Sequence, residues 1–213
     1  MPAVEPGRCG EHWDDCPRLA AGERFDFACA GCGDCCRQRR DLVLSGYDLY
    51  RIARRLSLPP RIVAAAFCKS YLAPESCLPA LRLTPDPKTG NCRFFEGSAC
   101  TIHAARPLAC ALYPLGQSID TVTAQTEYYV QTPLCGARAG EARTLQDYLQ
   151  DSAVLDRAGV DARWAIVCTQ LSHRLQAAGG ADNPRFSAAV RRMERALYYD
   201  LSLIHISEPT RHA

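Results

Sequence analysis

The sequence has almost no excess of charge of either sign. Its 213 residues include 25 Lys and Arg against 23 Asp and Glu, which gives a formal net charge of +2. A protein that binds nucleic acid or an anionic membrane through its overall electrostatic field carries a much larger excess of basic residues. We therefore expect no nucleic-acid partner.

The sequence also has no apolar run long enough to cross a bilayer. One of the longest runs, Ile62–Cys68, is far shorter than the roughly 20 residues of a membrane-spanning helix. The first residues, MPAVEPGRCGEHWDD, lack the basic segment and apolar core of a secretory signal. These absences predict a cytoplasmic protein with no membrane partner.

Several motifs that indicate particular enzymes are missing as well. The sequence has no Gly-rich strand-to-helix turn of an ordinary methyltransferase, no Walker-type Gly/Lys loop and no H-E-x-x-H. The sequence therefore leaves open whether the protein is an enzyme.

Cysteine is what the sequence has in excess, with 13 residues. The odd number and the lack of an export signal favour thiolate chemistry in a reducing compartment over disulfides. The densest stretch is Cys29-x2-Cys32-x2-Cys35-Cys36. C-x2-C spacing lets a tight turn direct two sulfurs at one point, and Gly33 supplies the backbone freedom that such a turn needs. Adjacent side chains do not converge easily, so we expect Cys35 or Cys36 to reach a second metal or to bridge two.

A second group of metal-binding residue types follows, spaced Cys92-x7-Cys100-x2-His103-x6-Cys110. A hairpin between the first two would bring their sulfurs together, and Cys135-Gly136 could return one more thiolate after a strand. His103 either binds the metal itself or lies outside the ligand set and hydrogen-bonds one of the metal-bound sulfurs. Eight sulfurs and one imidazole suffice for two four-coordinate centres. The candidate metal ligands are Cys29, Cys32, Cys35, Cys36, Cys92, Cys100, His103, Cys110 and Cys135.

The ligand spacing favours an iron–sulfur cluster of the 4Fe–4S type, with zinc as the alternative. Three cysteines in one C-x2-C-x2-C run, completed by a remote cysteine, are typical of iron–sulfur proteins, whereas structural zinc usually takes two separated pairs. Thiolates suit both metals. Arg37 and Arg106 are candidates to contact the cofactor and offset its negative charge, or else belong to a solvated basic face. Cys68, Cys77 and Cys168 are expected to be structural.

The pattern of apolar residues predicts a helix pair after the first cysteine group. Ser45 and Asp48 can cap a helix whose apolar face runs to Leu56, and a second helix begins near Pro60 and runs to about Tyr71. Short strands and turns are expected between residues 81 and 134. They comprise a hairpin closed through residues 96–99, a helical segment between Pro107 and Pro114, and a strand over residues 122–130.

Three further helices are expected after residue 141. The first has Leu145, Tyr148 and Leu149 on one face, the second begins behind Asp161 as its cap, and the third starts at Asn183-Pro184. The sequence thus predicts an α+β fold: a small cysteine-rich, metal-stabilised domain with short strands and a helix pair, followed by a helical C-terminal segment.

We divide the chain into an N-terminal extension over residues 1–22, a cysteine-cluster domain over 23–140 and a helical segment over 141–200. The extension contains Cys9-x2-His12-x3-Cys16, a weak candidate for a metal-binding motif. Residues 201–213 include LSLIHISEPTR, which resembles the in-frame translation of a sequencing adapter. Such a segment is excluded from the fold, and the natural chain is then expected to continue differently after about residue 200.

The cysteine motifs, taken in order, resemble the YkgJ-type cysteine-cluster family, whose CxxCxxCC domain is described as zinc- or iron-chelating. The resemblance covers about residues 25–136, and related domains occur in flagellin lysine N-methylases. It implies a bacterial cytoplasmic protein that binds a metal or cluster. The matching segments are Phe27-x-Cys29-x2-Cys32-Gly33-x-Cys35-Cys36-Arg37, Cys92-x-Phe94, and Cys100-x-Ile102-His103-x2-Arg106-Pro107-x2-Cys110-x2-Tyr113-Pro114.

Three functions are compatible with these observations. The first is a metal-binding protein with an eight-cysteine constellation and a redox or accessory role, acting with an unknown protein partner. The second is an S-adenosylmethionine-dependent, lysine methyltransferase-like enzyme, by analogy with the methylases. The third is a zinc-stabilised nucleic-acid or protein interaction module, against which the near-neutral charge counts.

Overall fold

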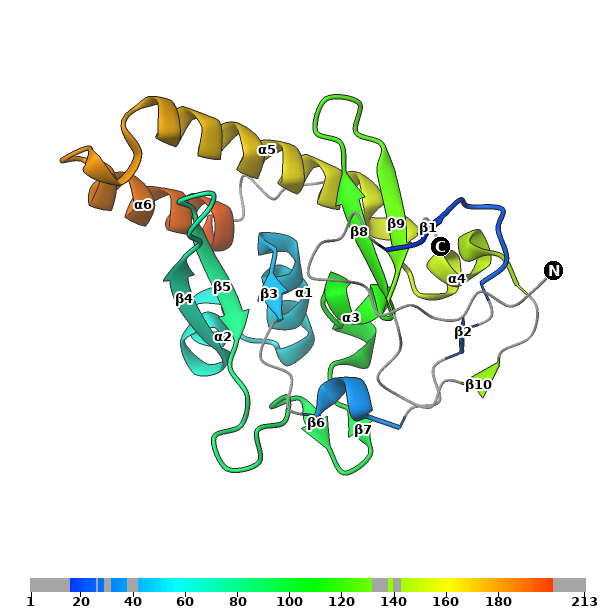
Figure 1. Cartoon of the computed structure of the whole chain (residues 1–213). Coiled ribbons are helices and arrows are strands. Elements are labelled where there is room, and N and C mark those ends of the chain that lie inside the picture. The colour runs from blue at the N-terminus through cyan, green and yellow to red at the C-terminus, as the bar shows by residue number, and fades with distance from the viewer. Residues whose placement is uncertain are drawn as a thin grey trace, which may run out of the picture.

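The computed structural model describes residues 16–25, 27–28, 32–37, 42–131, 138–139 and 143–200 (Figure 1). Helices and short antiparallel strands mix along these ranges, so the α+β prediction is confirmed. Several predictions fall outside the described residues. They concern the adapter-like segment 201–213, the candidate ligands Cys29 and Cys135, and the Cys9 and His12 positions of the candidate metal-binding motif in the N-terminal extension.

The first long helix, α1 (Gly46–Leu56), begins as the sequence predicts. The Ser45 hydroxyl accepts a hydrogen bond from the Asp48 backbone N–H, and the Asp48 carboxylate accepts one from the Ser45 N–H. This reciprocal capping satisfies two donors that the first helical turn would otherwise leave unpaired. Leu49 and Ile52 are fully buried on the face that the apolar spacing defines.

The second helix is shorter than predicted. Helix α2 (Pro60–Phe67) ends at Phe67 rather than near Tyr71, and the chain continues directly as strand β4 (Cys68–Leu72). All five β4 residues pair with β5 (Pro79–Leu83), which also pairs with β3 (Val43–Leu44). The sheet therefore supplies the backbone hydrogen bonds that a longer helix would have made.

The strand expected over residues 122–130 is in fact half of a hairpin. Strand β8 (Leu115–Ile119), which was not predicted, pairs with β9 (Thr126–Val130). Between them the Asp120 carboxylate accepts backbone hydrogen bonds from Val122, at 2.7 Å, and from Thr123, at 3.0 Å. This turn leaves Val122 93% exposed, because Asp side chains favour turns over strands.

The hairpin around residues 96–99 and the short helix after Pro107 are confirmed. Strands β6 (Phe95–Glu96) and β7 (Ala99–Cys100) pair, a 3₁₀ turn η3 (His103–Ala105) follows, and α3 spans Leu108–Leu112. Other short elements are the 3₁₀ turn η2 (Asp34–Cys36), strand β1 (Arg18–Leu19), which pairs with β9, and strands β2 (Phe27–Ala28) and β10 (Arg138–Ala139), which pair with each other.

The three C-terminal helices are present, with one correction. They are α4 (Leu145–Asp151), α5 (Ala158–Ala177) and α6 (Phe186–Glu194), with the short turns η4 (Leu155–Arg157), η5 (Gly180–Asp182) and η6 (Arg195–Tyr199). Asp161 does not cap α5, which begins three residues earlier. Its buried carboxylate pairs instead with Arg157.

Two hydrophobic cores hold these elements together, and the C-terminal helices contribute to both. In the first core Leu197 and Tyr198 pack with Leu49 and neighbouring residues of the helix pair. In the second, Leu145 and Leu149 pack with Phe25 and α3 residues. Figure 1 shows α5 along one edge of the molecule, with the β6–β7 hairpin near the opposite edge.

The sequence predicted free thiols and no disulfides, and one cysteine departs from this prediction. Cys16 is buried and disulfide-bonded, so it does not offer a thiolate in this structure. The cysteines that the structure describes as thiols are Cys32, Cys35, Cys36, Cys68, Cys77, Cys92, Cys100, Cys110 and Cys168. In the ranges given above, no helix is both long enough and apolar enough to cross a membrane.

Candidate metal centre

The first cysteine group folds into a tight turn that requires glycine. Gly33 has a φ of 75° and is buried against the Phe95 ring of the hairpin. A Cβ at Gly33 would lie only 2.2 Å from the ring's Cζ atom. Glycine is needed here for both reasons, the left-handed backbone and the close approach. The turn η2 follows directly and carries Cys35 and Cys36.

The adjacent cysteines of η2 converge, although their spacing predicted that they would not. Their Sγ atoms lie 4.0 Å apart. Sulfurs that share a tetrahedral metal at about 2.3 Å are separated by about 3.8 Å, so this distance is close to one edge of a metal tetrahedron. The 3₁₀ turn brings the two side chains to one side.

A backbone hydrogen bond attaches the second cysteine group to the first, and another orders the second group itself. The Cys92 N–H donates to the Cys36 carbonyl at 2.8 Å, and the Phe95 N–H donates to the Cys92 carbonyl at 3.0 Å. Strand pairing then places Cys100 opposite Phe95. Cys110 comes from the middle of α3. Three separate stretches of chain therefore bring their sulfurs to one region.

This region is a cavity of about 260 Å³. Five predicted ligand cysteines line it, together with His103 and Arg106, and apolar side chains complete the wall. The residues that line the cavity are Gly33, Cys35, Cys36, Leu42, Leu83, Cys92, Phe94, Phe95, Ser98, Ala99, Cys100, Ile102, His103, Arg106, Pro107 and Cys110. No carboxylate is among them, so the donor atoms are almost entirely sulfur.

The thiols of the cavity disfavour one another's ionisation. The pKa of Cys36 is raised, first by its hydrogen bond with Cys35, then by burial and by the neighbouring sulfurs of Cys35, Cys110 and Cys92. Burial also raises the pKa of Cys100, which Arg106 partly opposes. Closely packed thiolates need a compensating positive charge, which a metal ion supplies as it displaces their protons.

His103 lines the cavity but is held by Arg106. The Arg106 guanidinium donates to His103 Nε2, which therefore acts as an acceptor and leaves the proton on Nδ1. Burial and the Arg106 charge both lower the pKa of His103. In this arrangement neither ring nitrogen offers a lone pair to a metal, so the pair favours the interpretation of His103 as a neighbour of the sulfurs.

Arg37 and Cys32 lie at the edge of the site. Arg37 donates to the Cys32 carbonyl at 2.9 Å and to the Asp34 carboxylate at 2.7 Å, and its guanidinium stacks over the Phe95 ring. Cys32 is exposed and is not among the residues that line the cavity. Arg37 therefore stabilises the turn, and its contact with a cofactor stays a prediction.

The remaining sequence candidates, Cys29 and Cys135, lie outside the described residues. The strand that ends at Ala28, just before Cys29, pairs with the strand that begins at Arg138, shortly after Cys135. Among the residues that are described, no three His, Cys, Asp or Glu side chains form a group that could hold a single metal ion. The cavity thiols therefore line a wall and do not converge on a single metal position.

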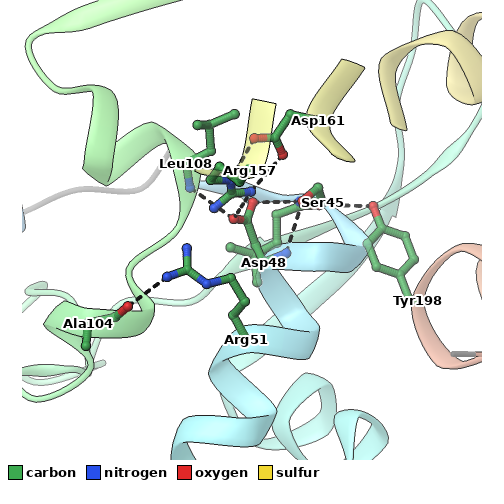
Figure 2. Close-up of polar contacts among 9 residues, drawn as sticks. Ser45, Asp48, Arg51, Ala104, Leu108, Arg157, Asp161 and Tyr198 are labelled. Atoms are coloured by element: carbon green, nitrogen blue, oxygen red, sulfur yellow. Dashed lines mark hydrogen bonds and ion pairs between the residues drawn. The ribbon is translucent and has the colours of Figure 1, made fainter. Parts of the chain in front are cut away.

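The residues that support this cavity were not predicted from the sequence. Phe95 packs on Gly33, and Asp48 and Arg51 of α1 bind the backbone of the segment that carries His103 and Cys110 (Figure 2). The Ser45/Asp48 capping pattern marked Asp48 only as part of a helix start. No signal in the sequence indicated its second role.

The fold and the site define a small α+β protein with a cavity lined by cysteines. Residues 28–136, about half of the chain, match a family model described as "CxxCxxCC: Putative zinc- or iron-chelating domain". The chain belongs to this family, and metal binding is the general property that its description gives. No curated protein and no solved structure matches the chain.

Proposed function

We propose that the protein holds an iron–sulfur cluster in the cavity of the two cysteine groups. The observation that carries this proposal is that five sulfurs from three stretches of chain line one space of about 260 Å³. A water molecule occupies about 30 Å³ in the liquid, so this space equals roughly nine waters. Zinc with four sulfurs at about 2.3 Å fills the centre of its own tetrahedron and needs no such space.

The donor set fits such a group. Cys35, Cys36, Cys92, Cys100 and Cys110 would hold it, with Cys29, Cys32 and Cys135 as further candidates from outside the cavity or outside the described residues. Soft thiolates are the ligands that iron–sulfur clusters and zinc prefer. A bound cluster would supply one-electron transfer, which supports a redox or accessory role.

The chain's own residues set the environment of the site. Apolar side chains such as Phe94 and Ile102, which are 4% and 1% exposed, exclude water from the cavity wall. Arg106 contributes positive charge near Cys100. Solvent exclusion and nearby charge are among the means by which proteins tune the potential of a cluster.

The decisive experiment is anaerobic purification of the full chain with visible absorption, metal analysis and sulfide analysis. We expect a coloured protein with iron and acid-labile sulfide. A colourless protein that contains zinc would refute the cluster and support a structural zinc site. A protein without either metal would refute the metal centre.

Matched serine variants test the ligand assignment. Cys110→Ser removes a thiol that faces the cavity, so the bound metal should be lost. Cys168→Ser is the control, because Cys168 is a half-buried thiol of helix α5 that does not line the cavity. Equal metal content in the two variants would contradict the assignment.

A further inference from the structure

Two side chains of helix α1 hydrogen-bond to the backbone of the segment between His103 and Cys110 (Figure 2). The Arg51 guanidinium donates to the Ala104 carbonyl at 2.7 Å, and the Asp48 carboxylate accepts from the Leu108 N–H at 3.0 Å. Leu108 is the first residue of α3, and Cys110 lies two residues further along this short helix. The first bond therefore holds the turn η3 against α1, and the second holds the start of α3.

The Asp48 carboxylate is itself held from two further sides. Its Oδ2 atom accepts from the Ser45 N–H at 3.0 Å, and its Oδ1 atom pairs with Arg157 at 2.7 Å. Arg157 also pairs with Asp161 at 2.6 Å and 2.8 Å. Asp48, Arg157 and Asp161 are 3%, 2% and 5% exposed. Buried charges keep their ionised form only in paired positions, so this cluster has little freedom to rearrange.

We propose that Asp48 is a positioning residue of the metal centre, which holds Cys110 in place through the N-terminus of α3. The inference rests on the proposed metal function. Residues that do not touch the metal but hold a metal-binding side chain in place commonly control both the metal affinity and the arrangement of the ligands. Arg157 lies after residue 136, outside the matched domain. The helical segment is therefore part of the working metal-binding unit.

A second capping box in the same protein provides a matched control. In α4 the Asp147 carboxylate accepts from the Thr144 N–H at 3.0 Å, and the Thr144 hydroxyl accepts from the Asp147 N–H at 3.2 Å. Asp48 and Asp147 thus occupy the same position of the same motif. Asp48 is in addition buried and binds the Leu108 N–H and Arg157, whereas Asp147 is exposed. Asp147→Ala therefore measures the effect of losing the capping contact alone.

The experiment loads the full chain with Co²⁺ and follows the thiolate-to-cobalt absorption while a chelator competes for the ion. We expect Asp48→Ala to weaken Co²⁺ binding by about 10–100-fold and to change the absorption band. Asp147→Ala should alter neither. Equal effects of the two substitutions, or wild-type binding by a folded Asp48→Ala protein, would overturn the proposal.

A second pair of variants covers the case in which Asp48→Ala fails to fold. Arg51→Met removes the bond to Ala104 from a partly exposed side chain, and Arg55→Met makes the same change at an exposed position of the same helix. We expect weaker Co²⁺ binding for Arg51→Met alone, and equal binding would overturn the proposal. A wild-type chain that gives no thiolate-to-cobalt band, and that contains neither iron nor zinc after anaerobic purification, would instead refute the metal centre itself.

Discussion

Replacement of Gly33 by alanine tests whether the cysteine turn depends on close contact with the hairpin. The first cost comes from the backbone. An L-residue in the left-handed region, where Gly33 lies with a φ of 75°, costs about 1–2 kcal/mol. This cost is independent of any neighbour.

The second cost comes from the Phe95 ring. The new Cβ would lie 2.2 Å, 2.4 Å and 3.3 Å from its Cζ, Cε2 and Cε1 atoms, so the ring must move. Phe95 also lines the cavity and carries the Arg37 guanidinium on its face. Overpacking of this kind costs about 1–3 kcal/mol. We expect a total loss of about 2–5 kcal/mol for Gly33→Ala by addition of the two costs.

Gly90→Ala separates the two costs. Gly90 has a φ of 74°, but a Cβ there meets nothing within 4 Å. The assay is urea unfolding of the full chain at a fixed metal content. We expect Gly90→Ala to lose only about 1–2 kcal/mol of unfolding free energy.

A double-mutant cycle with Phe95→Ala then isolates the contact between turn and hairpin. In the Phe95→Ala background the cost of Gly33→Ala should fall to that of Gly90→Ala. Equal destabilisation by Gly33→Ala and Gly90→Ala in the wild-type background would show that the ring contact adds no cost.

Two further predictions concern buried charge and pH. Arg157→Met should lower the unfolding free energy by about 3–5 kcal/mol, because it leaves the buried Asp48 and Asp161 carboxylates without their cation; a loss below about 1 kcal/mol in urea unfolding would contradict this. Burial raises the pKa of Cys168 to about 11 in the folded chain, whereas the pKa of an unfolded cysteine is about 8.5. The stabilisation that this thiol contributes is therefore complete below about pH 8.5 and is lost as the pH rises toward about 11. In urea unfolding, the free energy of unfolding of Cys168→Ala should therefore fall less over that pH range than that of the wild-type chain.

Much of the local structure follows from the sequence, because it depends on residues close together in the chain. The Ser45/Asp48 capping box predicted the start of α1, and Pro107 predicted the start of the short helix α3. The hairpin through residues 96–99 was predicted from its turn residues. The errors arose where a partner strand decided the outcome, as at the end of α2, where β4 pairs with β5 instead.

The site was predictable in its residue types and partly in its members. The cysteine spacing indicated a metal centre, and five of the nine candidate ligands are cysteines that line the cavity with His103. The ring contact between Gly33 and Phe95 was not predictable, because it depends on how the turn and the hairpin meet. The bond between Arg106 and His103, which decides what the imidazole can do, depends on side-chain orientation.

Two groups of closely spaced thiols on short local elements can be read directly from the amino-acid sequence, since spacing and turn chemistry act within a few residues. That the two groups share one cavity, and that Asp48 links α3 to Arg157, depends on the folded chain. Those contacts join residues far apart in the chain. They exist because two hydrophobic cores pack the C-terminal helices against the cysteine region, which no local pattern records.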